Sequence, residues 1–295
     1  MLKRDCAPIT PEAWKQIDDE AKRVLQLDLA GRKLVGFDGP HGWQYAAVNT
    51  GQLALRTDGG LGVPWGLREV VPLIELRVPF ELPIMALDNA SRGAVLDLAA
   101  VVTAAEKTAQ AEDHAIFNGF KAGGIEGIIP SSPHPAMTIP EEYAHYPSIV
   151  VRAVETLRRG GVNGPYALAL GPNCYAGLAQ AAEDGYPIRE RVEHFLDGPI
   201  VLAPKVEGAV VLSVRGGDFQ LSVGQDLSIG YAGRDKDTVF LYLTESFAFR
   251  VLERAAAVYL KPRSGSPAHG SGGSEVADAV GRGAGTHPKR VRRAS

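Results

Sequence analysis

The segment from residue 46 to residue 80 restricts the fold more than any other part of the sequence, because its extended runs have no core of their own. An apolar run at Leu53-Ala54-Leu55 precedes the turn signal Asp58-Gly59-Gly60, and a second run follows at 73–78. The pattern predicts a long hairpin. Since an isolated two-stranded hairpin is at best marginally stable in water, we expect this arm to find its partner surface elsewhere.

Two amphipathic helices are predicted on either side of the arm. A helix is predicted over 13–29, because Thr10 is a favourable N-cap residue and Pro11 is favourable in the first turn. Gly31 is expected to end this helix. The strongest helical periodicity covers 97–122, where apolar residues recur at three- and four-residue steps. We expect this second helix to form the spine of the fold.

Shorter elements alternate in the second half of the chain. A helix over 147–159 leads into a strand over 166–170, and four more short strands are expected afterwards, with Gly216-Gly217 as a hairpin turn between the second and third of them. This alternation predicts an α+β fold. The four strands are 200–202, 209–214, 219–223 and 239–243.

Charge is distributed unevenly along the chain. The 31 Lys and Arg residues face 34 Asp and Glu residues, a net charge of -3 that argues against nucleic acid as a partner. The Gly- and Ser-rich stretch 262–295 carries +4, which leaves the rest of the chain acidic. We predict a disordered tail over 262–295, with contact between its basic end and an anionic surface as the lesser alternative.

Cysteine usage and the termini indicate a cytoplasmic protein. Cys6 and Cys174 are the two cysteines, too far apart in the sequence for a disulfide framework or a Cys-based zinc site. The first residues lack the apolar core of a signal peptide. No segment approaches the roughly 18 apolar residues of a spanning helix, so we expect no membrane contact.

Candidate catalytic patterns fail on specific missing residues. The string 215–219 superficially resembles the cyclase signature of cyclic-di-GMP synthesis, but Phe219 stands where a second carboxylate is required. An iron site on the spine helix lacks the Glu-x-x-His pairs of di-iron bundles, and we interpret its acidic residues as a solvated or interface-paired face. Nucleophile motifs are absent, and Cys174 is interpreted as a buried structural thiol. We therefore expect no enzyme activity and no metal site. The acidic and histidine residues considered on the spine helix are Glu106, Glu112, Asp113 and His114.

A set of short strings distributed over residues 1–261 closely resembles family 1 (type 1) encapsulin shell proteins. Each string is weak alone, and together they are specific to that family. They include Leu2-Lys3-Arg4, Gly31-Arg32-Lys33, Pro72 to Arg77, Glu112-Asp113, Ile116 to Gly119, Gly185-Tyr186-Pro187, Arg215 to Phe219 and Gly224 to Tyr231.

The resemblance implies the fold of tailed-phage major capsid proteins and assembly into an icosahedral shell, with about 60 copies in its simplest form. The predicted hairpin would be the extended loop that reaches over a neighbour. The implied divisions are an N-terminal arm and helix over 1–45, the extended loop over 46–75, the peripheral domain over 76–130 and 226–261, the axial domain over 131–225, and the tail over 262–295.

The resemblance also implies two functional regions. The inner surface of such shells binds a C-terminal targeting peptide of the cargo enzyme, and apolar pockets with one fixed charge suit an extended peptide. The expected docking residues are Leu29, Arg32, Ile229, Tyr231 and Leu241. The second region is a loop that lines the five-fold pore, where repeated acidic groups favour cations. Its residues are Glu183, Asp184, Gly185 and Tyr186.

Cargo and cofactors are the least determined part of the interpretation. We expect a ferritin-like iron oxidase, which makes the particle an iron store, with a haem-containing dye-decolourising peroxidase as the alternative. Met85 stands where flavin-binding members have a stacking tryptophan, so the shell is expected to bind no flavin. A secreted bacteriocin or protease and a true viral capsid subunit are the competing classes.

Overall fold

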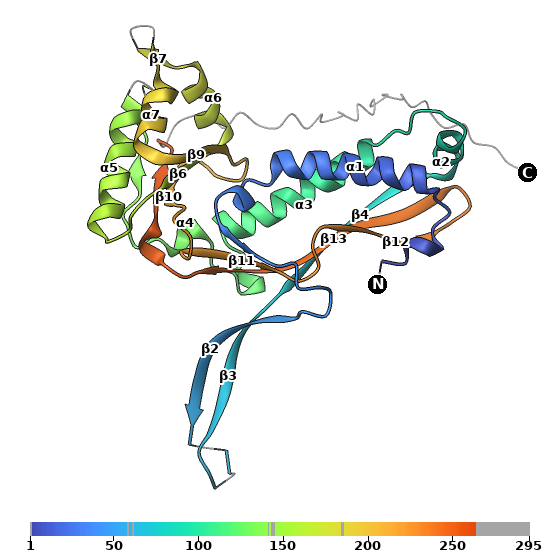
Figure 1. Cartoon of the computed structure of the whole chain (residues 1–295), viewed down its shortest axis with the longest axis horizontal. Coiled ribbons are helices and arrows are strands. Elements are labelled where there is room, and N and C mark those ends of the chain that lie inside the picture. Colours follow the sequence, from blue (N-terminus) through green and yellow to red (C-terminus); the bar gives the residue numbers. More distant parts are fainter. Residues whose placement is uncertain are drawn as a thin grey trace, which may run out of the picture. The chain divides into compact units, whose positions relative to one another are not determined.

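The computed structural model describes residues 2–57, 59–60, 62–140, 142, 145–183 and 186–263, without the side chains of Glu183 and Tyr186. The predicted tail therefore lies outside the described residues except for its first two positions. Two mixed sheets, two helical groups and a projecting hairpin make up this part of the chain (Figure 1).

The first sheet is organised around one long strand, β13 (Thr238–Val251). It pairs in antiparallel fashion with β4 (Ile74–Pro83) over ten positions and with β12 (Ser228–Arg234) and β11 (Phe219–Val223) along shorter lengths. β1 (Gly36–Asp38) adds a parallel strand to β11. A long central strand thus joins segments that are far apart in the sequence.

Two helices cover this sheet and enclose an apolar core with it (Figure 1). Thr10 caps α1 (Pro11–Asp28), because its hydroxyl accepts from the Ala13 amide at 3.3 Å. α1 buries Ala13, Ile17, Ala21, Val24 and Leu25 against α3 (Ala99–Phe117) and the strands. A shorter helix, α2 (Ile84–Ser91), follows β4 directly.

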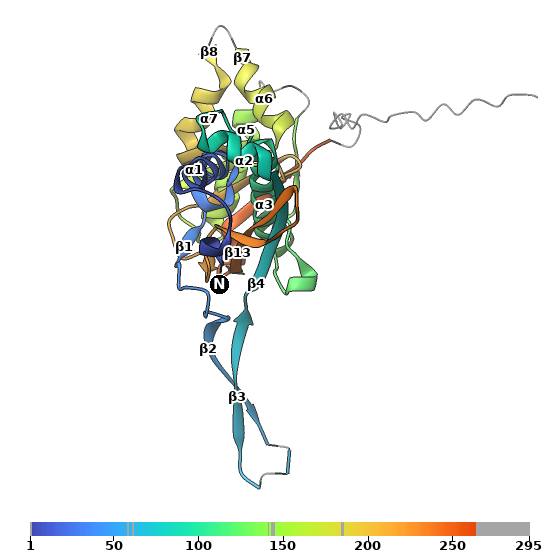
Figure 2. The ribbon, with the colours of Figure 1, turned by 90° about the vertical axis from the view of Figure 1, so that its right-hand side faces the viewer.

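The second sheet has the order β5-β14-β10-β6-β9 and belongs to a second, larger core. Helices α5 to α7 gather at this end of the molecule (Figures 1 and 2). The strands are β5 (Met137–Thr138), β6 (Tyr166–Leu170), β9 (Asp197–Leu202), β10 (Ala209–Ser213) and β14 (Ala257–Lys261). The helices are α4 (Ile128–Ser131), α5 (Tyr146–Arg159), α6 (Pro172–Gln180) and α7 (Ile188–Leu196).

The hairpin of β2 (Ala47–Arg56) and β3 (Trp65–Pro72) projects away from both sheets (Figure 2). The predicted pairing of the arm was wrong in its second strand. Leu73 to Val78 do not return along Leu53 to Leu55. The strand that pairs with β2 is β3, and the following residues 74–83 form β4, which pairs with β13 in the first sheet. Ile74, Leu76 and Val78 are half-buried against the cores of the body, because β4 pairs with β13 there. The alternation of the sequence alone does not reveal this distant partner.

Three other predictions need correction. The spine helix ends at Phe117 rather than near 122, because Gly119 adopts a positive φ of 84° one residue after the C-cap. Gly216-Gly217 is no hairpin turn, since it carries the chain from β10 in one sheet to β11 in the other. Glu112 and Asp113 are buried rather than solvated, because their partners come from elsewhere in the chain.

The predicted strand over 166–170 and the helix through Arg159 are confirmed, and Cys174 is buried. Burial raises the pKa of the Cys174 thiol, which keeps it protonated and unreactive. None of the described helices is both long and apolar enough to cross a membrane.

Candidate functional site

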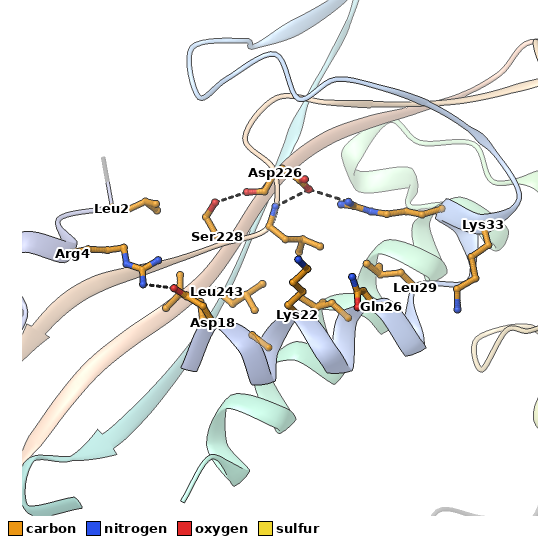
Figure 3. Close-up of a pocket in the computed structure, with 15 residues that line it drawn as sticks. Leu2, Arg4, Asp18, Lys22, Gln26, Leu29, Lys33, Asp226, Ser228 and Leu243 are labelled. Carbon is orange, nitrogen blue, oxygen red and sulfur yellow. Dashed lines mark hydrogen bonds and ion pairs between the residues drawn. The ribbon is translucent and has the colours of Figure 1, made fainter. Parts of the chain in front are cut away.

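A groove of about 620 Å³ opens between one face of α1 and the strand β12 (Figure 3). Its floor is apolar because α1 and the sheet bury their contact residues beneath it. The floor residues are Leu25, Leu29, Leu227, Ile229 and Leu243, and Leu2 from the N-terminal segment joins them at one end.

Charged side chains stand around this apolar floor. Lys22 and Gln26 extend from α1 and are exposed, and Lys33 follows the helix in the turn η2 (Gly31–Lys33), where its ammonium group donates to the Leu27 carbonyl at 2.9 Å. Asp18 and Asp226 provide the acidic groups. An apolar slot with a mixed polar rim suits an extended peptide with apolar side chains better than a small polar substrate.

Arg32 forms the inner wall of the groove and binds three carboxylates from three different elements. Its Nη2 lies 2.8 Å from Glu112 Oε2 on α3 and 2.5 Å from Glu245 Oε1 on β13, and its Nη1 lies 2.9 Å from Asp226 Oδ1 before β12. Glu112 and Glu245 are fully buried, whereas Asp226 is 40% exposed. One guanidinium therefore ties the end of α1 to the spine helix and the sheet.

The charges of this cluster do not balance if every carboxyl is ionised. Burial raises the pKa of Glu245, and the nearby charge of Glu112 raises it further against the opposing effect of Arg32. Glu245 Oε2 accepts no hydrogen bond, and a proton there relieves the repulsion between the two carboxyls. Burial lowers the pKa of Arg32, but its hydrogen bonds to Glu112 and the negative charges of Glu112, Glu245 and Asp226 together outweigh that effect, so the pKa is raised.

Asp113, next to Glu112 on α3, fixes the backbone just beyond α1. Its two oxygens accept from the amides of Ala30 at 3.0 Å and Gly31 at 2.8 Å. Burial raises the pKa of Asp113 to about 7, although both amide bonds oppose that shift. Neighbouring residues on one turn of α3 thus hold the turn that presents Arg32 to the groove.

The N-terminal segment closes one end of the groove. The Leu2 carbonyl accepts from the Tyr231 amide of β12 at 2.8 Å. Arg4 pairs with Asp18 at 2.6 Å and lies 3.9 Å above the Trp14 ring. Each of these contacts is partly exposed and is worth about 1 kcal/mol or less.

The structure brings three of the five predicted docking residues together. Leu29, Arg32 and Ile229 line the groove. Tyr231 contributes its backbone at the closed end, and Leu241 is buried in the core beneath. Leu243, two residues further along β13, takes the position expected of Leu241. The rim residues Asp18, Lys22 and Gln26 were not predicted from the sequence, although their spacing of four residues indicates one face of α1.

The predicted pore loop is only partly described. Glu183 and Tyr186 pair in the short ladder of β7 (Ala182–Glu183) and β8 (Tyr186–Pro187), while Asp184 and Gly185 lie outside the described residues. Within the described ranges, no group of three His, Cys, Asp or Glu side chains is arranged to hold a metal ion.

Met85 is the residue that stands where flavin-binding members have a stacking tryptophan. It lies on α2 and is 75% exposed.

The Arg32 cluster predicts how stability depends on pH. The pKa of Glu245 is higher in the folded than in the unfolded chain, so its protonation stabilises the fold at low pH and this contribution is lost as pH rises through the folded pKa. Glu245→Gln keeps a neutral group with a donor beside Glu112. We expect its melting temperature to equal that of the wild type near pH 5 and to exceed it at about pH 9. The difference should be about 2–4 °C for each kcal/mol of unfolding free energy that the wild type loses as Glu245 is deprotonated.

Thermal unfolding at several pH values measures this difference, and Glu106→Gln on the exposed side of α3 serves as the matched control. A wild type and a Glu245→Gln variant with parallel pH profiles would contradict the assignment.

Comparison with known proteins agrees with this architecture. A family model described as an encapsulating protein for peroxidase matches residues 1–248. A type 1 encapsulin shell protein of Rhodospirillum rubrum is 44% identical over 268 residues, which cover 88% of this chain and 96% of that protein. The type 1 encapsulin shell protein of Mycobacterium tuberculosis is 43% identical, with 88% of this chain and 98% of that protein covered.

Solved structures resemble the fold at much lower identity. A virus-like particle from Pyrococcus furiosus matches with a TM-score of 0.58 at 17% identity, covering 82% of this chain and 98% of that one. The capsid of Myoviridae phage XM1 matches with a TM-score of 0.56 at 13% identity, covering 81% and 92%. The fold is thus the α+β fold of phage capsid proteins, and the chain belongs to the family of type 1 encapsulin shell proteins.

Proposed function

We propose that this chain assembles into an icosahedral shell in the cytoplasm and holds an enzyme inside through a C-terminal segment that docks in the groove between α1 and β12. The observation that carries the docking proposal is the apolar floor of that groove beside the edge of β12, with Arg32 fixed behind it. Alternate side chains of an extended segment would enter the floor while its backbone follows the strand.

Filling the groove should prevent cargo loading without disturbing the shell. Gln26→Trp places a large ring over the floor from an exposed position, so the α1 core stays intact. We expect cargo copies per purified shell to fall at least about tenfold, the factor that roughly 1.4 kcal/mol of lost binding gives. Leu27→Trp, one residue further and outside the groove lining, is the control.

Quantitative mass spectrometry of shells from co-expression with the native cargo gives the copy number. Equal loading of the Gln26→Trp and Leu27→Trp shells would contradict docking in this groove.

We further propose that the hairpin of β2 and β3 is the extended loop and ties neighbouring subunits together. We also propose that the first sheet belongs to the peripheral domain and the second sheet to the axial domain. On this division β11 joins the peripheral domain and β14 the axial domain, the reverse of the bounds that the resemblance implied. Leu55 is 76% exposed and Leu67 57% exposed, on a hairpin that contributes little to either core. Burial of such side chains between subunits contributes about 1.5–3 kcal/mol each, repeated at every copy of the interface.

Leu55→Asp should therefore abolish large particles in size exclusion and negative stain, while far-UV circular dichroism of the body stays unchanged. Gln52→Asp introduces the same charge at an exposed polar position of β2 and should still assemble. Assembly of both variants would show that the hairpin is dispensable.

The pore proposal rests on the sequence of 183–186. Glu183 and Asp184, repeated around a symmetry axis, would attract cations into the shell. Shells carrying Glu183→Gln and Asp184→Asn should load ferrous iron more slowly than the wild type, as followed by absorbance of the oxidised product formed by an iron-oxidising cargo. Unchanged loading rates would remove this role.

Two cargo classes fit the proposal. A ferritin-like iron oxidase would make the particle an iron store. The alternative is a dye-decolourising peroxidase, and the description of the matching family names a peroxidase. Mass analysis of particles purified from the native cell distinguishes the two directly.

A further inference from the structure

One edge of β12 faces the groove. Within the described part of the chain, β12 pairs only with β13. Backbone groups of alternate residues in a strand point to the same side. Since the Tyr231 amide points away from β13 to Leu2, the backbone of Ile229, two residues earlier, faces that same edge above the groove floor.

The N-terminal segment already uses this edge. The Leu2 carbonyl accepts a hydrogen bond from the Tyr231 amide at 2.8 Å. A peptide added to this edge as a further strand would make the same hydrogen bond. The Leu2 side chain lines the groove at the same end, as Figure 3 shows. The register of β12 against β13 shifts directly after Tyr231, so the regular edge ends at this residue.

Two further contacts hold the segment across the groove. The Arg4 guanidinium binds Asp18 on α1 at 2.6 Å and covers the Trp14 ring, so the segment spans from β12 to α1. Both side chains of the ion pair are partly exposed, at 31% and 43%. These contacts position the segment, and the ion pair between Arg4 and Asp18 is the one that a single substitution removes.

We propose that residues Leu2 to Arg4 are an end stop of the cargo groove, which limits a docked peptide strand to the β12 edge before Tyr231. This inference rests on the proposed docking function and concerns the length that the groove accepts. A longer peptide cannot bind the Tyr231 amide or the groove floor next to it, because Leu2 occupies both. When the end stop is released, the Tyr231 amide and this part of the floor become accessible to the peptide.

The test compares two reporters in competition. A green and a red fluorescent protein carry C-terminal alternating serine and leucine peptides of about five and about eight residues, the first being an ordinary strand length. Both are co-expressed with the full shell protein, and the ratio of colours in purified shells gives the preference for the longer peptide. An experiment with the peptides exchanged between the colours controls for the reporters.

Arg4→Gln and Asp18→Asn each remove the ion pair that holds the segment to α1, and Asp19→Asn, whose ion pair with Lys15 lies outside the groove lining, is the matched control. We expect the wild type and Asp19→Asn to take up both reporters equally. Arg4→Gln and Asp18→Asn should favour the longer peptide about tenfold, since an added backbone hydrogen bond and a buried leucine together reach that factor.

A shell that lacks residues 2–5 removes the segment outright, so the test stays decisive if the single substitutions leave the segment in place. This deletion should show the same preference for the longer peptide. An equal ratio in this deletion, or a preference for the longer peptide already in the wild type, would overturn the end stop. Failure of the docking proposal looks different, because both reporters would then be absent from wild-type shells or unaffected by Gln26→Trp.

Discussion

The contact of Arg32 with three carboxylates is the interaction on which the rest of the first sheet and its helices depend. Glu112 comes from the spine helix, Glu245 from the long central strand and Asp226 from the turn before β12, so one side chain sets the distances among them. Removal of one partner of a buried ion pair typically costs about 3–5 kcal/mol, because the remaining charge stays buried. The cluster of Arg32 and its three carboxylates therefore stabilises the fold and, through it, fixes the wall of the groove.

The hairpin places the opposite demand on the chain. The body buries its apolar side chains in two cores, whereas β2 and β3 expose Leu53, Leu55 and Leu67 far from both. Such an arm raises the free energy of a lone subunit and lowers that of an assembly that covers it. Membership in a shell family agrees with this geometry, because neighbouring subunits of a shell can cover apolar side chains that the single chain leaves exposed.

The sequence predicted the elements of this fold better than it predicted their partners. Periodicity located α1, α5 and β6, because local spacing alone determines which face is apolar. It misassigned 73–78 and Gly216-Gly217, because the pairing of β4 with β13 and the passage between sheets are long-range choices. The acidic residues of α3 were misread for the same reason, since Arg32 is 80 residues away from Glu112. The docking role of Leu29, Arg32 and Ile229 comes from family resemblance and stays a prediction, and the structure places all three in the groove lining. Leu241 is buried in the core, whereas Leu243, two residues further on the same face of β13, lines the groove. The alternation of a strand predicts its apolar face, and it does not predict which residue of that face lies at a groove.

Because Arg32 serves both the fold and the groove, the positions around the groove differ in how freely they can vary. Leu29 and Ile229 are buried and Arg32 is held by its ion pairs, so a change at any of them alters the folded body together with the groove. Lys22 and Gln26 are exposed on α1 and contact little besides the groove itself. Under the proposed docking function, cargo preference changes at the lowest cost to the fold through these exposed positions of α1, because a new side chain there contacts a docked peptide without altering the core.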